Sequence, residues 1–283
     1  MKIQKHRFVS ENGNENVRFE KTPNQSGQFK DNLPDTIIIH YTGGNSLESS
    51  VNWLKNPKAN ASAHVVVGKT GEIVQLLPFN VIAWHAGISR WNDRQRLNNY
   101  SIGIEIDNAG LLEKRAEGYY TCFDKRMSNQ KVVLARHKHE NEEKAWEAYN
   151  EKQIVAVEEI CHLLKDSYNI NEILGHDDIS PGRKIDPGPA FPLQKLQDKI
   201  LYGRRTDEPF HLEDMQTKSE YRGVVTAEYL NIRSKPNIDS LKIMDPLPRG
   251  TRVDILKQQG NWLYVDVDIA GWVHKNWIKT SGK

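Results

Sequence analysis

Short apolar runs that end in glycines mark the first strands of the chain. In the segment DTIIIHYTGG, residues 36–39 have high β propensity and lead directly to His40, which is typical of a buried central strand. In SAHVVVGKTGEIVQLLP, residues 65–67 and 72–77 form two further runs, separated by the turn residues 68–71. This spacing predicts a β-hairpin.

The segment YSIGIEIDNAG predicts a strand with two different faces. Its residues 101–107 alternate with a period of two, so three isoleucines point to one side of the sheet and Glu105 and Asp107 point to the other. A carboxylate on such a strand is either solvated or part of a site. Of the two, Asp107 is the better candidate for the solvated residue.

From residue 150 the apolar positions change to helical spacing. They recur at steps of three and four residues, which predicts an amphipathic helix, at Ile154, Val157, Ile160, Cys161, Leu164 and Tyr168. A second helix is expected near residues 193–201. The intervening insert, residues 111–151, is long for a structureless loop, so part of it is expected to be ordered.

Polar segments divide the chain into domains. Residues 1–34 are polar and lack periodicity, which indicates a loosely ordered lead-in. Residues 35–203 form the main domain, and the polar stretch 204–220 is interpreted as a linker. In residues 221–283 the pattern becomes all-β, with short strands expected at 224–227, 230–233, 252–256, 262–267 and 270–274.

The composition is that of an ordinary soluble globular protein, with 37% hydrophobic and 27% charged residues in a chain of 283. A net charge of +2 without a basic stripe argues against nucleic acid as a partner. No segment is apolar enough to span a membrane, and the N-terminus lacks the apolar stretch of a signal peptide, which favours the cytoplasm. Cys122 and Cys161 make no disulfide framework and are interpreted as buried or partly buried thiols.

The segment GHDDISPGRKIDPGPAF carries the candidate chemistry. His176 and Asp186 lie ten positions apart in a loop rich in Pro and Gly, which can double back, and His40 at a strand end is a natural third partner. Two histidines and an aspartate are ligands that catalytic zinc takes. Each residue also has a structural reading: a turn at Asp186, a solvated loop at His176 and a satisfied core histidine at His40. Spacing alone does not decide between these readings.

Five motifs in order resemble those of zinc-dependent N-acetylmuramoyl-L-alanine amidases of the type-2 amidase and peptidoglycan-recognition-protein superfamily. They are IIIHYTGG, SAHVVVGKTGEIVQLLP, AWHAGIS, NNYSIGIEIDNAG and GHDDISPGRKIDPGPAF, and they cover roughly residues 35–202. The tail, with LNIRSKPN, GNWLYVDV and AGWVHKNWI, is similar to bacterial SH3-like domains. The resemblance implies an α/β fold with a mixed central β-sheet flanked by helices, followed by a small all-β SH3-like barrel.

The same resemblance implies a site. One Zn²⁺ would be bound by His40, His176 and Asp186, where some relatives carry a cysteine in place of the aspartate. Glu105 maps to the family's acidic catalytic residue and Lys184 to its lysine. Glu105 would act as general base and acid, and Lys184 would stabilise the oxyanion. Without the resemblance, Lys184 would be read as a surface lysine.

Four further residues are candidates for contact with the substrate: Tyr41, His64, Trp84 and His85. Tyr41 and Trp84 offer flat faces that suit sugar rings, although most aromatic residues belong to the core. The other histidines, among them His137, have no argument beyond a solvated or structural role. The expected partner is peptidoglycan or a muropeptide, and a monomer is expected.

Two other functions stay open at this point. A sensor would bind wall fragments without cleaving them, although such proteins typically lose a metal ligand and this chain does not. A zinc peptidase would cut within the stem peptide instead. The location is open as well. The SH3-like tail is expected to bind cell wall, which favours polymeric wall outside the membrane as the place of action. Release through a lysis pore, or secretion as an effector, would reconcile the tail with the missing signal peptide.

Overall fold

The computed structural model describes residues 1–10, 16–30, 32–202, 222–234, 236–238, 240, 242, 245–267, 270–274 and 278–281. The chain divides into two compact units, Met1–Glu208 and Pro209–Lys283. The predicted linker, residues 204–220, lies outside the described residues.

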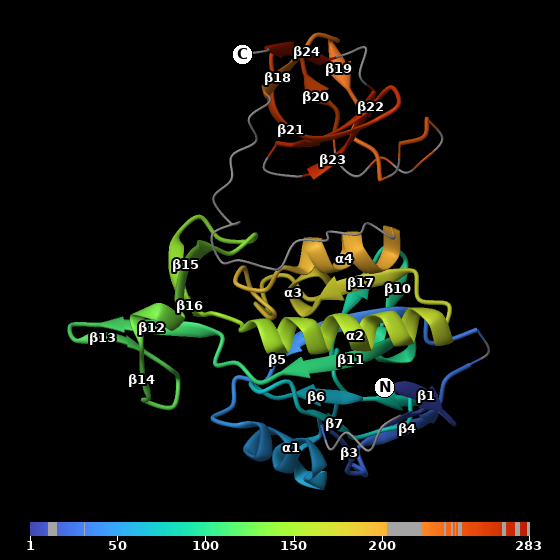
Figure 1. The fold of residues 1–283 in the computed structure, drawn as a ribbon, viewed down its shortest axis with the longest axis vertical. Helices are drawn as coiled ribbons and strands as arrows, with labels where there is room; N and C mark the ends of the chain where they lie inside the picture. Colours follow the sequence, from blue (N-terminus) through green and yellow to red (C-terminus); the bar gives the residue numbers. More distant parts are fainter. Residues whose placement is uncertain are drawn as a thin grey trace. The chain divides into compact units, whose positions relative to one another are not determined.

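The first unit is built on a six-stranded mixed sheet (Figure 1). Four neighbouring strands, from the edge strand β17 to β6, are parallel, and the hairpin partner β7 is antiparallel to β6, which confirms the predicted mixed sheet and hairpin. In spatial order the strands are β17 (Glu172–Gly175), β5 (Thr36–Tyr41), β11 (Ser101–Ile106), β6 (Val65–Val67), β7 (Ile73–Gln75) and β3 (Val17–Phe19). The side chains of residues 37–39 are fully buried, as expected for a central strand.

Helices cover the sheet. Helix α1 (Leu47–Lys55) packs its apolar side against β6 and β7, and α2 (Glu151–Ser167) and α4 (Leu193–Tyr202) pack on each other. Reciprocal side-chain caps fix both helix starts, Ser46 with Ser49 in α1 and Asn150 with Gln153 in α2. The helix predicted from periodicity, α2, and the second helix expected near residues 193–201, α4, are both confirmed. The single turn α3 (His176–Ile179) follows β17 directly.

The prediction of a loosely ordered lead-in is wrong for the described part of residues 1–34. This part contains β1 (Lys2–Gln4), β2 (Arg7–Val9), β3 and β4 (Gln25–Gln28), and β4 pairs with β8 (Val81–Ala83). The strands have only three or four residues, too few to show a periodicity, and β3 and β4 pair with distant segments, whereas β1 and β2 pair with each other. Phe8 packs edge-on against Phe79 at 4.9 Å between ring centroids.

The insert forms a sheet of its own, which confirms that it is ordered in part. It projects from one end of the central sheet in Figure 1 and has the strand order β14 (Arg126–Met127), β13 (Gly118–Tyr120), β12 (Leu111–Arg115), β16 (Glu143–Glu147) and β15 (Val132–Arg136). Ala109, Leu112, Met127 and Ala145 form its small core. The remaining short elements of this unit are β9 (Arg90–Trp91), β10 (Arg94–Gln95), η1 (Pro57–Ala59), η2 (Leu97–Asn99) and η3 (Asn129–Lys131).

The second unit is all-β, as predicted. Its strands are β18 (Arg222–Val225), β19 (Tyr229–Leu230), β20 (Leu247–Pro248), β21 (Arg252–Gln259), β22 (Trp262–Asp266), β23 (Ala270–His274) and β24 (Ile278–Ser281). Five of them form one antiparallel sheet around a core that includes Ile232, Val253 and Val265.

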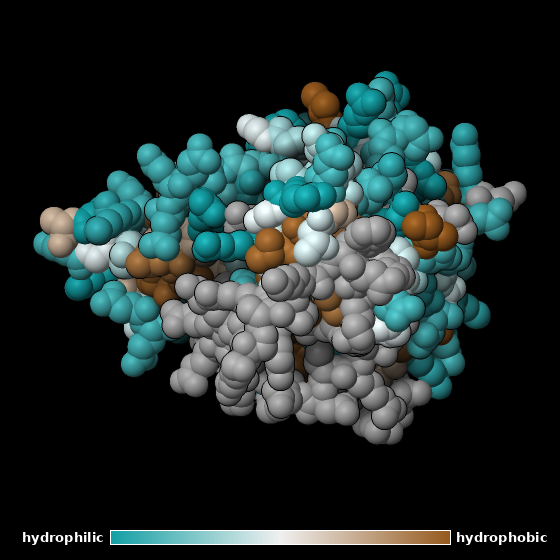
Figure 2. All heavy atoms as spheres, turned by 90° about the horizontal axis from the view of Figure 1, so that it is seen from above, coloured by the Kyte–Doolittle hydropathy of each residue, from teal (hydrophilic) through white to brown (hydrophobic). Residues whose placement is uncertain are grey.

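The two cysteines are free, but they differ in exposure. Cys161 is buried in α2, as predicted, whereas Cys122 is exposed on the insert and corrects the expectation of a buried or partly buried thiol. Among the described residues, no helix has both the length and the apolar character needed to cross a membrane. The coloured surface in Figure 2 is mostly hydrophilic, with apolar side chains in separate small groups.

Candidate metal centre and cleft

The candidate site lies where the parallel strands end. His40 is next to last in β5, and the register of the sheet places Glu105 of β11 opposite it. On the other side of β5, Gly175 of β17 pairs with Ile39, so His176 begins α3 one position further along. Because the ends of parallel strands meet at one edge of a sheet, residues from three distant segments converge there.

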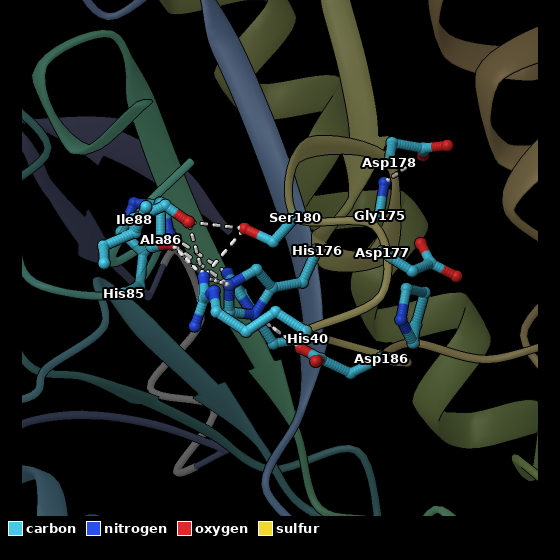
Figure 3. Close-up of polar contacts among 12 residues, drawn as sticks. His40, His85, Ala86, Ile88, Gly175, His176, Asp177, Asp178, Ser180 and Asp186 are labelled. Atoms are coloured by element: carbon cyan, nitrogen blue, oxygen red, sulfur yellow. Dashed lines mark hydrogen bonds and ion pairs between the residues drawn. The ribbon is translucent and has the colours of Figure 1, made fainter. Parts of the chain in front are cut away.

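The structure brings the three predicted ligands together (Figure 3). His40 Nδ1 lies 2.9 Å from His176 Nδ1, and Asp186 Oδ2 lies 3.0 Å from each of these nitrogens. All three residues are buried. The doubling back of the loop that was expected for residues 176–186 is closed by the backbone N–H of Asp177, which donates to the carbonyl of Asp186 at 2.9 Å.

The contacts of the second ring nitrogen fix the tautomer of each histidine. His176 Nε2 faces the carbonyl oxygen of Ala86 at 3.1 Å, so it carries the proton and donates it there. His85 Nε2 likewise faces the carbonyl oxygen of Ser101 at 3.2 Å, which leaves His85 Nδ1 as an acceptor. His40 Nε2 lies 3.0 Å from that acceptor and therefore donates to it. Both Nδ1 atoms of the pair His40 and His176 are left with free lone pairs.

The charge state of the cluster follows from its surroundings. Burial, together with the neighbouring His176, lowers the pKa of His40 from 6.5 to about 4. Burial also lowers the pKa of His85 well below its usual value. For Asp186, burial acts in the opposite sense, but the neighbouring His176 and His40 lower its pKa, so it stays ionised.

This donor set fits a metal ion. The two Nδ1 atoms and Asp186 Oδ2 are all acceptors, and no proton lies between any two of them. A cation placed among them would be bound by all three lone pairs. Two neutral imidazoles and a carboxylate are ligands of catalytic zinc, and they leave a divalent ion with net positive charge.

The same segment supports both histidines. Residues 84–88 supply the ring of His85, which holds His40, and the carbonyl of Ala86, which holds His176 (Figure 3). Gly103 makes this possible, because a Cβ at that position would lie 2.3 Å from the ring of His85. His85 lines the cleft, but its main contact is with a ligand, a role that its sequence context did not reveal.

His64 does not lie in the cleft, which corrects its predicted contact with substrate. Its side chain is fully buried, with Nε2 against the carbonyl oxygen of Val81 at 2.8 Å and Nδ1 accepting from the backbone N–H of Gly103 at 3.0 Å. Both ring nitrogens are therefore occupied by backbone groups. His64 joins β8 to β11.

The other predicted residues line one cleft of about 580 Å³. Glu105, Lys184, Tyr41 and Trp84 all contribute to its wall. Glu105 Oε2 is buried without a hydrogen-bond partner. Burial raises the pKa of Glu105 well above its usual value, Asp186 raises it further and Lys184 lowers it. Gly110 allows Tyr41 to pack closely, because a Cβ there would lie 2.2 Å from the phenol ring.

Some residues at the cleft were not predicted. Trp53 of α1 lines it and is 58% exposed. Arg183 lines it as well and donates to the carbonyls of Ala86 and Ile88 at 3.1 and 2.7 Å. The position of Arg183, directly before Lys184 in the motif, was a usable signal, whereas nothing in the sequence marks Trp53.

The insert braces the ligand loop from another side. His137, which is buried, lies with Nε2 2.9 Å from Asp177 Oδ2, and Lys138 pairs with Asp177 and Asp178 at 2.9 and 2.6 Å. Tyr149 donates its hydroxyl to the carbonyl of Pro187 at 2.8 Å. Of the two roles left open for His137, solvated or structural, its burial and its contact with Asp177 fit the structural one.

Two neutral histidines and a carboxylate that could hold a metal ion, with a second carboxylate in the same cleft, are the groups that metal-dependent hydrolases use. Sequence comparison then gives the family. The N-acetylmuramoyl-L-alanine amidase family model matches residues 30–189, and the bacterial SH3 domain model matches residues 228–279. The chain belongs to the N-acetylmuramoyl-L-alanine amidase family and carries a bacterial SH3 domain.

Individual relatives agree with this assignment. The chain is 34% identical over 170 residues to N-acetylmuramoyl-L-alanine amidase AmiD of Escherichia coli K12, covering 56% of this chain and 51% of AmiD. It is 33% identical over 189 residues to 1,6-anhydro-N-acetylmuramyl-L-alanine amidase AmpD of Salmonella typhimurium LT2, covering 60% of this chain and 82% of AmpD. The match thus spans about half the length of AmiD but most of AmpD.

One solved structure is that of E. coli AmiD in complex with the substrate anhydro-N-acetylmuramic acid-L-Ala-D-gamma-Glu-L-Lys. It aligns with a TM-score of 0.45 at 31% identity, covering 58% of this chain and 56% of AmiD.

Proposed function

We propose that this chain hydrolyses the amide bond between the lactyl group of muramic acid and the L-alanine of the peptidoglycan stem peptide, with one Zn²⁺ bound by His40, His176 and Asp186. The observation that carries the proposal is the meeting of this ligand set with Glu105 and Lys184 in one cleft. Membership of the amidase family supports the choice of bond. When bound, zinc supplies Lewis acidity, which polarises a carbonyl and lowers the pKa of water.

Glu105 takes the proton from the attacking water. Its position opposite His40 in the sheet places it beside the ligands, and its raised pKa makes it a stronger base than an exposed glutamate, as suits a group that accepts a proton and then releases it. As the carbon–nitrogen bond breaks, Glu105 passes this proton to the alanine nitrogen. The products are a lactyl carboxylate and a stem peptide with a free amino group.

Lys184 stabilises the negative charge that develops on the carbonyl oxygen. It lines the cleft two residues from Asp186, and its charge lowers the pKa of Glu105. A fixed cation beside developing charge lowers the barrier without reorganisation. Tyr41 and Trp84 offer aromatic walls to the substrate in the same cleft.

The test is product analysis by mass spectrometry, in water enriched in ¹⁸O, with intact sacculi and with soluble muropeptides. The proposal expects free stem peptides beginning with L-alanine, and ¹⁸O in the lactyl carboxylate. Cleavage within the stem would instead make the protein a zinc peptidase, and binding without cleavage by the zinc-loaded protein would make it a sensor. Release from sacculi would show that polymeric wall is a substrate, and release only from soluble fragments would exclude it.

A further inference from the structure

A second cavity lies next to the catalytic cleft. It has a volume of about 600 Å³, and Trp84 lines both spaces. The indole N–H of Trp84 donates to Ser26 Oγ at 2.7 Å, which holds the ring in place between the cleft and this neighbouring cavity. A ligand held at the metal centre can therefore extend past Trp84 into the neighbouring cavity.

The wall of the neighbouring cavity is rich in amides and carries a single charged side chain among its described residues. Its polar side chains include Asn60, Gln95 and Asn99, with Arg96 as the one charged residue among the described residues that line it. Amides offer donors and acceptors together, which matches hydroxyl and acetamido groups, and an aromatic face suits a sugar ring. A stem peptide, by contrast, carries several charges that this wall does not balance.

The side chain of Ile88 is exposed to solvent at the same cavity. Ile88 is 85% exposed, yet its carbonyl oxygen accepts from Ser180 Oγ and from Arg183, each at 2.7 Å. Figure 3 shows Ile88 beside Ala86, at the end of the segment 84–88 that contacts His40 and His176. A large apolar residue on a fixed backbone loses little conformational freedom when a ligand covers it.

The backbone around the cavity is held in an uncommon form. Asn60 and Arg96 adopt left-handed conformations with φ of 50° and 58°. This conformation is unfavourable for Arg and is found where the surrounding structure maintains it, often at binding sites. The backbone N–H of Arg96 donates to the carbonyl of Ser89 at 2.9 Å, which fixes this turn.

We propose that this cavity is a subsite for a neutral amino sugar, the one that precedes muramic acid in a glycan strand. The proposal rests on the proposed function. The scissile bond joins a sugar to a peptide, so the bound substrate extends from the metal centre in two directions, the glycan on one side and the stem peptide on the other. The amide-lined side takes the glycan. The preferred substrate is then at least a disaccharide muropeptide.

The experiment compares two substrates with the same stem peptide, one with muramic acid alone and one with the preceding amino sugar. The zinc-loaded wild type is expected to show a KM about tenfold lower for the disaccharide, with a similar kcat, as for uniform binding. Ile88→Ser and Gln95→Ala should raise the KM for the disaccharide about tenfold and leave the KM for the monosaccharide unchanged. Both side chains are exposed, so neither change is expected to impair folding.

Val155→Ser is the matched control, because Val155 is 54% exposed on α2 and is not among the residues that line the cavity. Equal KM values for both substrates in the wild type, or an equal rise for both in the variants, would overturn the subsite. If the wild type cleaves neither substrate, the proposed function fails instead. Calorimetric binding of the two intact muropeptides to the same variants then decides the subsite by itself.

Discussion

Two regions hold the candidate metal ligands and the loop at residues 176–186, and they do so by different physical means. The segment at residues 84–88 acts through neutral contacts, an imidazole on His40 and a carbonyl on His176. The insert acts through the charge of Lys138 on Asp177 and Asp178, together with the ring of His137, which lies against Asp177. The first region fixes which ring nitrogen of His40 and of His176 carries the proton. The second fixes the position of the loop at residues 176–186 through Asp177. We therefore expect changes in the first to alter metal affinity and changes in the second to alter stability.

The largest effect is expected when the metal ligands themselves are lost. His176→Ala removes one of three donors, and activity should fall about a thousandfold or more, because metal chemistry contributes several kcal/mol to such reactions. The measurement is turnover of a soluble muropeptide with metal content determined in parallel. Chelation of the wild type should give the same loss, and added zinc should reverse it. Turnover that persists in metal-free protein would contradict the assignment of the site.

His85 tests the first region. His85→Asn can place its amide oxygen where Nδ1 accepts from His40, whereas His85→Gln cannot, so the Gln variant should lose about 10–100-fold in zinc affinity and the Asn variant less. Chelator competition measures the affinity, and the ¹⁵N shifts of the His40 ring report its tautomer. Equal affinities in both variants and the wild type would show that His85 does not position His40.

His64 is the control within the same core, because it is buried but does not touch a ligand. Burial lowers its pKa from 6.5 to about 4, so its contribution to stability is present above pH 6.5 and is lost as the pH falls toward 4. Between pH 7 and pH 5 this amounts to about 2 kcal/mol in the free energy of unfolding. Denaturant unfolding of metal-free wild type and His64→Asn should show a smaller loss in the variant. A variant with the same pH dependence would mean that His64 is not held neutral.

The insert is expected to give the smallest effect on the metal. His137→Ala leaves Asp177 without one buried partner, which should cost about 1–3 kcal/mol of stability. The loss of zinc affinity in His137→Ala should be smaller than the loss in His85→Gln. The two quantities come from denaturant unfolding and chelator competition on the same sample. A large loss of affinity with unchanged stability would reverse the roles assigned to the two regions.

The sequence predicted the strands and helices whose periodicity is local. The runs before His40 and around Glu105, and the helix after Asn150, belong to elements that bury one side or are buried throughout, so their pattern is strong. The strands before residue 30 were missed because they have only three or four residues, and because the partners of β3 and β4 are far along the chain. Among site residues, the motifs named the three side chains that the structure brings together, His40, His176 and Asp186. They did not reveal that His85 contacts His40 or that His64 contacts only backbone groups, because hydrogen-bond partners are set by tertiary packing.

The most direct test of the account is the replacement Glu105→Gln, which keeps shape and removes the base. Metal content and turnover of a muropeptide are measured on the same preparation. We predict about one zinc ion per chain, as in the wild type, with turnover lower by about 10²–10⁴-fold. A variant that binds zinc and keeps wild-type turnover would contradict the proposed role of Glu105 and, with it, the mechanism built on this cleft.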